Sequence, residues 1–205
     1  EALPQSGRQH GTAVAALLVG GADSRTPGLV PGAELVAVDA FYDPARDSDR
    51  AEAFDLVRGL DLLAGREVAV VNMSLAGPAN LLLERAVALA AERGIVIVAA
   101  AGNKGPRAAP LYPAGYEPVI AVTAIDRSKR PYRRAGQGEH IDIAAPGVNV
   151  WTAASVRGAR PKSGTSFAAP FVTAAVALLK AGDATMSTDE IIDALVANAE
   201  DLGEP

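Results

Sequence analysis

The chain has 205 residues, of which 49% are apolar and 21% charged, with a net charge of −5 and no cysteine. This composition is typical of one globular domain and excludes a disordered chain, a disulfide scaffold and a thiolate metal site. Because it has no Lys/Arg run of five or more residues and no uninterrupted apolar run of about 18, we expect no nucleic-acid partner and no membrane-spanning segment.

Helical patterns and apolar runs alternate along the first half of the chain. In order, they predict a helix over residues 10–19, a strand over 34–41, a helix from a capping box at Asp49 and Glu52 to Leu63, a strand over 68–74 and a helix over 81–93. Gly20 and Gly94 follow the first and last of these helices, where glycine commonly ends a helix.

The second half continues the same alternation. It predicts a strand over 95–101, short strands over 119–125, 141–145 and 148–152, a long apolar helix after Gly164, and a last helix that Ser187 and Glu190 cap and that ends near Asn198. Apolar strands separated by helices indicate an α/β fold: a three-layer sandwich with a mostly parallel central sheet, formed by one domain over residues 1–205. In such sheets the functional site lies at the carboxyl ends of the strands.

Three polar residues that could do chemistry stand where a predicted strand ends or a predicted helix begins. His10 opens the helix in HGTAVA, Asn103 ends the segment AAAGN after the strand over 95–101, and Ser166 opens the helix in GTSFAAP. Each also has a plain structural alternative: a surface histidine in a frayed helix start, an ordinary Gly-Asn turn and a serine N-cap.

Together the three residues supply the parts of a nucleophilic site. Serine can be the nucleophile, histidine its base, and an asparagine amide can hold developing negative charge. At the start of a helix, Ser166 would also benefit from free N–H groups and the positive end of the helix dipole. We place Pro170 in the first turn of that helix, where its missing N–H costs no intrahelical bond.

Four motifs, HGTAVA (10–15), VVNMSLAGP (70–78), AAAGN (99–103) and GTSFAAP (164–170), resemble in this order those of the subtilisin-like serine proteases, the subtilase or peptidase S8 family. The resemblance covers most of the chain. It implies a serine endopeptidase that forms an acyl-enzyme, with His10 as general base, Asn103 as oxyanion donor and Ser166 as nucleophile. Chain order agrees with this resemblance and not with an α/β-hydrolase. In this chain the histidine precedes the serine, whereas α/β-hydrolases place the serine first, within a GxSxG turn.

The resemblance also implies a substrate cleft for a peptide or protein. An extended peptide would pair with the backbone of Ser74, Leu75 and Ala76, and Ala101, Gly102 and Leu111 would line the cleft. Ala76 and Leu111 are larger than the residues usual at these places, which predicts a preference for small or medium apolar side chains before the cleaved bond. Alternatively, both side chains merely pack in the core.

The family's catalytic aspartate precedes the histidine, but only nine residues precede His10 and Glu1 is the only carboxylate among them. We therefore expect a domain that is truncated at both ends and weakly active or inactive by itself, unless a preceding segment or a second chain supplies the acid. One alternative is a catalytically dead domain used for binding or scaffolding. Another is an esterase or other serine hydrolase.

No cofactor is predicted. Calcium is common in the family, but residues 20–32 contain one acid, Asp23, and a solvated loop explains Asp43, Asp47 and Asp49 better than a cation site does. We interpret His140 as a surface residue beside a strand. The resemblance suggests a secreted or periplasmic bacterial protein.

Overall fold

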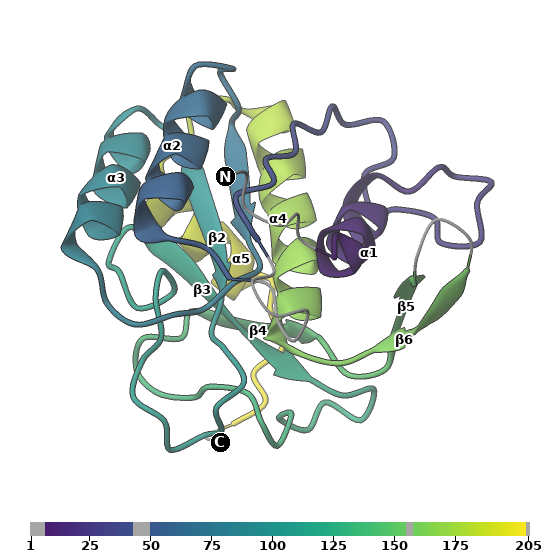
Figure 1. Cartoon of the computed structure of the whole chain (residues 1–205). Helices are drawn as coiled ribbons and strands as arrows, with labels where there is room; N and C mark the ends of the chain where they lie inside the picture. Colours follow the sequence, from purple (N-terminus) through teal and green to yellow (C-terminus); the bar gives the residue numbers. More distant parts are fainter. Residues whose placement is uncertain (1–6, 43–49, 155–157, 204–205) are drawn as a thin grey trace.

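The computed structural model describes residues 7–42, 50–154 and 158–203, and its centre is a four-stranded sheet. The strands are β1 (Val70–Met73), β2 (Val96–Ala100), β3 (Val119–Ile125) and β4 (Ile143–Pro146), in the order β1-β2-β3-β4 and all parallel (Figure 1). All five residues of β2 are buried, because this strand has a neighbour on each side and helices on both faces. The predicted α/β sandwich with a parallel sheet is confirmed.

Helices cover both faces of the sheet, so that its alternating side chains divide into two cores. One face packs against α2 (Ala53–Ala64) and α3 (Leu81–Glu92), and Ile97 and Ala99 point into that core. The other face packs against α4 (Thr165–Gly182) and α5 (Thr188–Ala197), and Val96, Val98 and Ala100 point into that one. The period of two along β2 produces this division.

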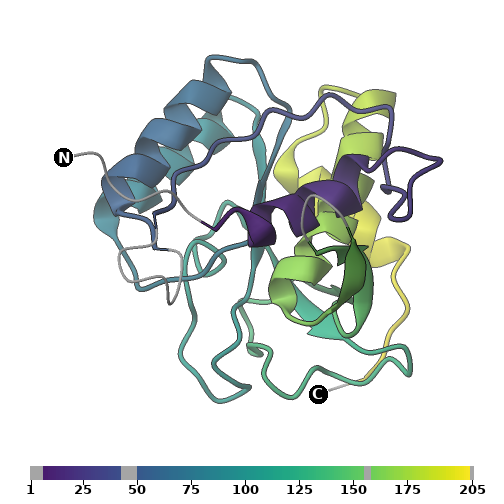
Figure 2. The same cartoon turned by 45° about the vertical axis from the view of Figure 1, so that its right-hand side comes forward.

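A smaller unit lies outside α4, where α1 (Gln9–Val19) packs beside an antiparallel hairpin of β5 (Val150–Ala153) and β6 (Ala159–Lys162) (Figures 1 and 2). Ala13, Val14 and Leu17 form a small apolar cluster with Phe167 of α4. The buried Thr152 hydroxyl donates to the Ala13 carbonyl at 2.6 Å. These contacts fix α1 and the hairpin to the amino-terminal end of α4.

Most predicted elements form, with ends that differ by a few residues. The capping box of Ser187 and Glu190 is present, Asn80 caps α3 through its side chain, and Gly94 has a φ of 80° after α3. The strand β6 was not predicted, because its sequence, Ala-Arg-Pro-Lys, has no apolar pattern. Its partner β5 supplies the apolar side of the hairpin.

Two local predictions are wrong. Residues 34–41 form no strand, because they have no hydrogen-bonded ladder partner in the described chain; Val38 instead lies against α2, where a Cβ on Gly59 would come within 3.3 Å of it. Glu52 is the residue that precedes α2 and not its third residue, and it makes no side-chain cap. Its carboxylate accepts a hydrogen bond from the Tyr42 hydroxyl at 2.7 Å, while Asp49 lies outside the described residues.

Among the described helices, α4 has the length and apolar composition that could cross a membrane. It contacts all four strands of the sheet, and 56% of the segment Thr165–Gly182 is buried inside the protein. This burial is that of a central core helix.

The burial of β2 gives a test of the fold. Ile97 is 0% exposed, so Ile97→Ala should lower the free energy of unfolding by about 2–5 kcal/mol through lost contacts and a cavity. Leu89 on α3 is 56% exposed, so Leu89→Ala should change it by less than about 0.5 kcal/mol. Urea denaturation measures both, and equal effects would contradict the two-core arrangement.

Candidate active site

Ser166 is the second residue of α4, at the carboxyl edge of the sheet. The preceding Gly164 has a φ of 150°, and its N–H donates to the Gly147 carbonyl at 2.8 Å. A Cβ at Gly147 would meet that of Ala124 at 2.5 Å, so only glycine lets the loop approach β3 this closely. Ser166 is half-buried, within the first turn, where backbone N–H groups lack intrahelical acceptors.

Asn103 reaches this helix start from the end of β2. Its side-chain oxygen accepts from the Thr165 N–H at 3.1 Å, and the Gly102 N–H donates to the Thr165 hydroxyl at 3.0 Å. Within the described residues, neither the Asn103 Nδ2 group nor the Ser166 N–H has an acceptor. Both donors lie next to Thr165, so one external oxygen atom can accept hydrogen bonds from both of them.

His10 approaches the same helix start from α1. Its ring centroid lies 5.5 Å from that of Phe167, the residue that follows Ser166. The histidine is exposed at the start of α1, while Phe167 is buried in the cluster that joins α1 to α4. The structure thus brings His10, Asn103 and Ser166 to one end of α4 from three separate segments.

Ser74 contacts the site from the end of β1, and it takes over a hydrogen bond that Pro170 cannot make. The prediction that Pro170 lies in the first turn of α4 is wrong. Pro170 is the sixth residue of α4, not part of its first turn, so the helix lacks the N–H that would reach the Ser166 carbonyl. The Ser74 hydroxyl donates to that carbonyl at 2.8 Å. Asn72 Nδ2 donates to the Ser74 oxygen at 2.9 Å, and the Thr173 hydroxyl donates to Asn72 Oδ1 at 2.9 Å.

The other predicted cleft residues lie around the same sheet edge. Ala76 is exposed, and Leu75 packs partly into the core. A Cβ at Gly102, whose φ is 92°, would meet Leu111 at 2.4 Å and Ala76 at 3.3 Å, so these three residues form one packed corner. Ala101 is only 2% exposed and contributes to the core.

Comparison with known proteins relates this arrangement to a family. The model of the subtilase family of peptidases matches residues 1–205. The chain belongs to the subtilase family. It is similar to subtilisin DY of Bacillus licheniformis, with 33% identity over all of this chain and 75% of that protein, and to subtilisin BL of Lederbergia lenta, with 34% identity over 99% and 74%.

Solved structures agree with the sequence comparison. The prenylagaramide maturation protease PagA superposes with a TM-score of 0.85 and 29% identity over 98% of this chain and 76% of that one. A cold-adapted subtilisin-like serine proteinase gives 0.84 and 27% identity over 94% and 68%. The chain is therefore a subtilisin-like serine endopeptidase domain, and the predicted family and enzyme class are confirmed.

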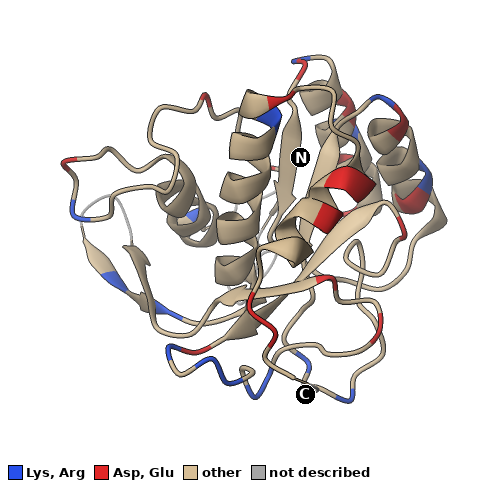
Figure 3. Cartoon of the chain, turned by 180° about the vertical axis from the view of Figure 1, so that it is seen from behind, with Lys and Arg blue, Asp and Glu red and all other residues tan. Residues whose placement is uncertain are grey.

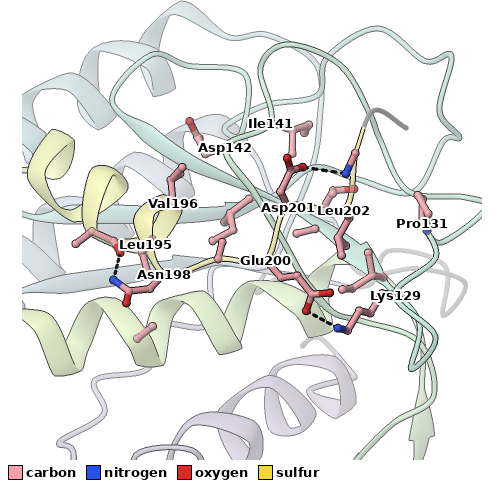
Figure 4. A pocket seen from close by; sticks show the side chains of 18 of the residues that line it. Lys129, Pro131, Ile141, Asp142, Leu195, Val196, Asn198, Glu200, Asp201 and Leu202 are labelled. Atoms are coloured by element: carbon pink, nitrogen blue, oxygen red, sulfur yellow. Dashed lines mark hydrogen bonds and ion pairs between the residues drawn. The ribbon is translucent and has the colours of Figure 1, made fainter.

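A separate groove of about 1160 Å³ lies beside the edge strand β4 of this subtilase (Figure 4). Leu178, Leu195 and Leu202 line it, and Asp142 lies at one side. Partial desolvation raises the pKa of Asp142, although a 2.7 Å hydrogen bond from the Ala121 N–H opposes the shift. None of the predicted site residues lines this groove, so it is separate from the candidate site at the start of α4.

The predictions for His140 and for metals have different outcomes. His140 is half-buried, and its buried Nε2 atom has no hydrogen-bond partner among the residues that the structure describes, so it is not the plain surface residue that we expected. No group of three or more His, Cys, Asp or Glu side chains that could hold a metal occurs among the described residues. Asp43, Asp47 and Asp49 lie outside them.

Several residues that hold the site together were not predicted. Thr165 was treated as part of a motif, yet it binds both Asn103 and Gly102. Asn72 lies within the apolar run predicted as a strand over 68–74 and was not considered separately. A polar residue inside such a run was the available signal, since buried amides keep hydrogen-bond partners.

The Ser74–Ser166 hydrogen bond predicts that Ser74 and Pro170 are coupled in their effects on stability. Ser74→Ala should lower the free energy of unfolding by about 1–2 kcal/mol, because the Ser166 carbonyl loses its donor. Pro170→Ala restores a backbone N–H four residues after Ser166, so the same Ser74→Ala change should cost about 1 kcal/mol less in that background. Urea denaturation of the four variants measures the coupling; Ser128→Ala, on an exposed loop, is the matched control. Strictly additive effects would contradict this account.

Proposed function

We propose that Ser166, His10 and Asn103 carry out peptide hydrolysis in this subtilase domain. The observation that supports this most is a pair of donors at the positive end of α4, Asn103 Nδ2 and the Ser166 N–H, for which the described part of the chain offers no acceptor. They suit the oxyanion that forms when a hydroxyl attacks a peptide carbonyl.

The proposed reaction is acyl transfer in two halves. The Ser166 oxygen attacks the peptide carbonyl while His10 takes its proton, and the two donors hold the resulting oxyanion. His10 then passes the proton to the leaving amine, which departs and leaves an acyl-enzyme. Water, deprotonated by His10, releases the acyl group and restores the serine. We further propose that an aspartate from a segment or chain beyond these residues orients His10.

We also propose a peptide path along the ends of β1 and β2. Ser74, Leu75 and Ala76 would offer main-chain hydrogen bonds to an extended substrate, with Ala101 and Gly102 opposite. Subtilisin DY and subtilisin BL come from bacteria, which supports a bacterial protein and, as a proposal, a secreted or periplasmic location.

The nucleophile can be tested directly. Ser166→Ala should abolish covalent labelling by a fluorophosphonate and lower peptide hydrolysis; the loss measured in subtilisins themselves, roughly 10⁶-fold in kcat, sets the scale. Asn103→Leu should cost roughly 10²–10³-fold, again the value of that family. Ser128→Ala, a change of the same kind on an exposed loop, should leave both readouts intact. Unchanged hydrolysis by Ser166→Ala would refute the proposal, and a wild-type protein without labelling or hydrolysis, even when supplied with the acid-bearing segment, would favour a scaffold.

The corner formed by Gly102, Ala76 and Leu111 predicts which side chain precedes the cleaved bond. Because Leu111 fills this space, the wild-type enzyme should prefer Ala or Leu to Phe there. Leu111→Gly should raise the Phe-to-Ala ratio of kcat/KM by about tenfold or more. Leu89→Ala on α3 is the control, and wild-type cleavage after Phe that equals or exceeds cleavage after Ala or Leu would contradict the assignment.

A further inference from the structure

The β5–β6 hairpin places two cations on the face that it turns toward α1 and α4. Lys162 pairs with Val150, and Arg160 pairs with Thr152. Val150 packs against the cluster that contains Phe167, and Thr152 is buried against α1. Since directly paired residues share one face of a sheet, Arg160 and Lys162 lie on this inner face.

The opposite face carries the alternate residues Trp151 and Pro161, which also pair. Trp151 is 56% exposed, and its indole N–H donates to the Arg25 carbonyl at 3.2 Å. The hairpin strands contain no acidic residue, and Figure 3 shows them with blue segments and no red ones. The hairpin is thus a local positive region on a chain whose net charge is −5.

Lys162 extends over the residue that follows Ser166. Its Nζ atom lies 5.8 Å from the centroid of the Phe167 ring, which itself lies 5.5 Å from the ring of His10. A cation over an aromatic face is attracted to it, which favours this position of the lysine. Lys162 and His10 therefore both lie close to the Phe167 ring at the start of α4.

No acidic partner neutralises Lys162 within the described chain. The ion pairs found there join Arg8 to Asp39, Lys129 to Glu200 and Arg130 to Asp126. Partial desolvation, together with the charge of Arg160, lowers the pKa of Lys162. An external anion beside Lys162 would therefore meet a positive charge that the protein itself leaves uncompensated.

The position of His10 tells which half of a substrate would meet Lys162. In the proposed reaction His10 gives its proton to the leaving amine, so the leaving half of the peptide lies beside His10. The acyl half would lie along Ser74–Ala76, at the ends of the strands. The hairpin lies on the other side, with α1 (Figures 1 and 2).

We propose that Lys162 is a specificity-determining residue that selects peptides with a carboxylate side chain, Asp or Glu, at the first or second position after the cleaved bond. Arg160 adds to the same positive field. This inference rests on the proposed function, because it takes the leaving half of the substrate to lie beside His10.

Binding to the Ser166→Ala variant tests the proposal without depending on turnover. Two peptides that differ only by Glu or Gln at the first position after the scissile bond, and a second such pair for the next position, are titrated by the fluorescence of Trp151, the only tryptophan of the chain. For at least one pair the Glu peptide should bind about fivefold tighter at low salt. The ratio should fall toward one at 0.5 M NaCl, where the Debye length is only a few Å.

Variants at Lys162 and at a remote cation assign the effect. In the Ser166→Ala background, Lys162→Met should bring the Glu-to-Gln ratio close to one, and Lys162→Arg should keep most of it. Arg127→Met removes an exposed positive charge elsewhere and should leave the ratio unchanged. Equal affinities in both pairs, no binding of any peptide up to millimolar concentration, or a preference that survives Lys162→Met would each overturn the proposal.

Failure of this inference can be told from failure of the proposed function. If fluorophosphonate labels wild-type Ser166 and peptides are cleaved, but Glu and Gln peptides bind alike, only the role of Lys162 is lost. If Ser166→Ala retains full hydrolysis, the proposed function itself fails, whatever the peptides show.

Discussion

The start of α4 is held against the ends of β1 and β2 by a few hydrogen bonds, and the candidate site depends on them. Asn103 accepts from the Thr165 N–H, and the Thr165 hydroxyl accepts from Gly102. Ser74 donates to the Ser166 carbonyl, which Pro170 leaves without its helical donor. Hydrogen bonds thus join β1, β2 and α4 around Ser166, and the Ser166 N–H has no acceptor within the described residues.

These hydrogen bonds form because the backbone of neighbouring loops approaches β2 and β3 closely. Gly147 and Gly136 lie where a Cβ would meet Ala124 at 2.5 Å and the Ala101 carbonyl at 2.8 Å. The face of α4 toward the sheet includes the buried Ala168 and Ala169, which let the helix come near the strands. The chain, which has 4% aromatic residues, reaches a tight core through small and β-branched side chains.

Local sequence gave correct predictions wherever the determining interactions are themselves local. The apolar run of β2, the capping box at Ser187 and the glycine after α3 were all readable, because period, caps and backbone freedom act within a few residues. Residues 34–41 have a strand-like composition, but no described segment pairs with them as a ladder partner. A strand depends on pairing with a distant segment, which composition does not specify.

For the site, the sequence by itself determined the residue types and their order: a histidine at one helix start, an asparagine at a strand end and a serine at another helix start. Only the tertiary structure decided that Phe167 links His10 to α4, that Thr165 holds Asn103, and that Lys162 of an unpredicted strand extends over Phe167. The physical reason is distance along the chain. Contacts such as that of Gly102 with Thr165 join residues 63 positions apart, and they form only when the sheet brings its strand ends to one edge.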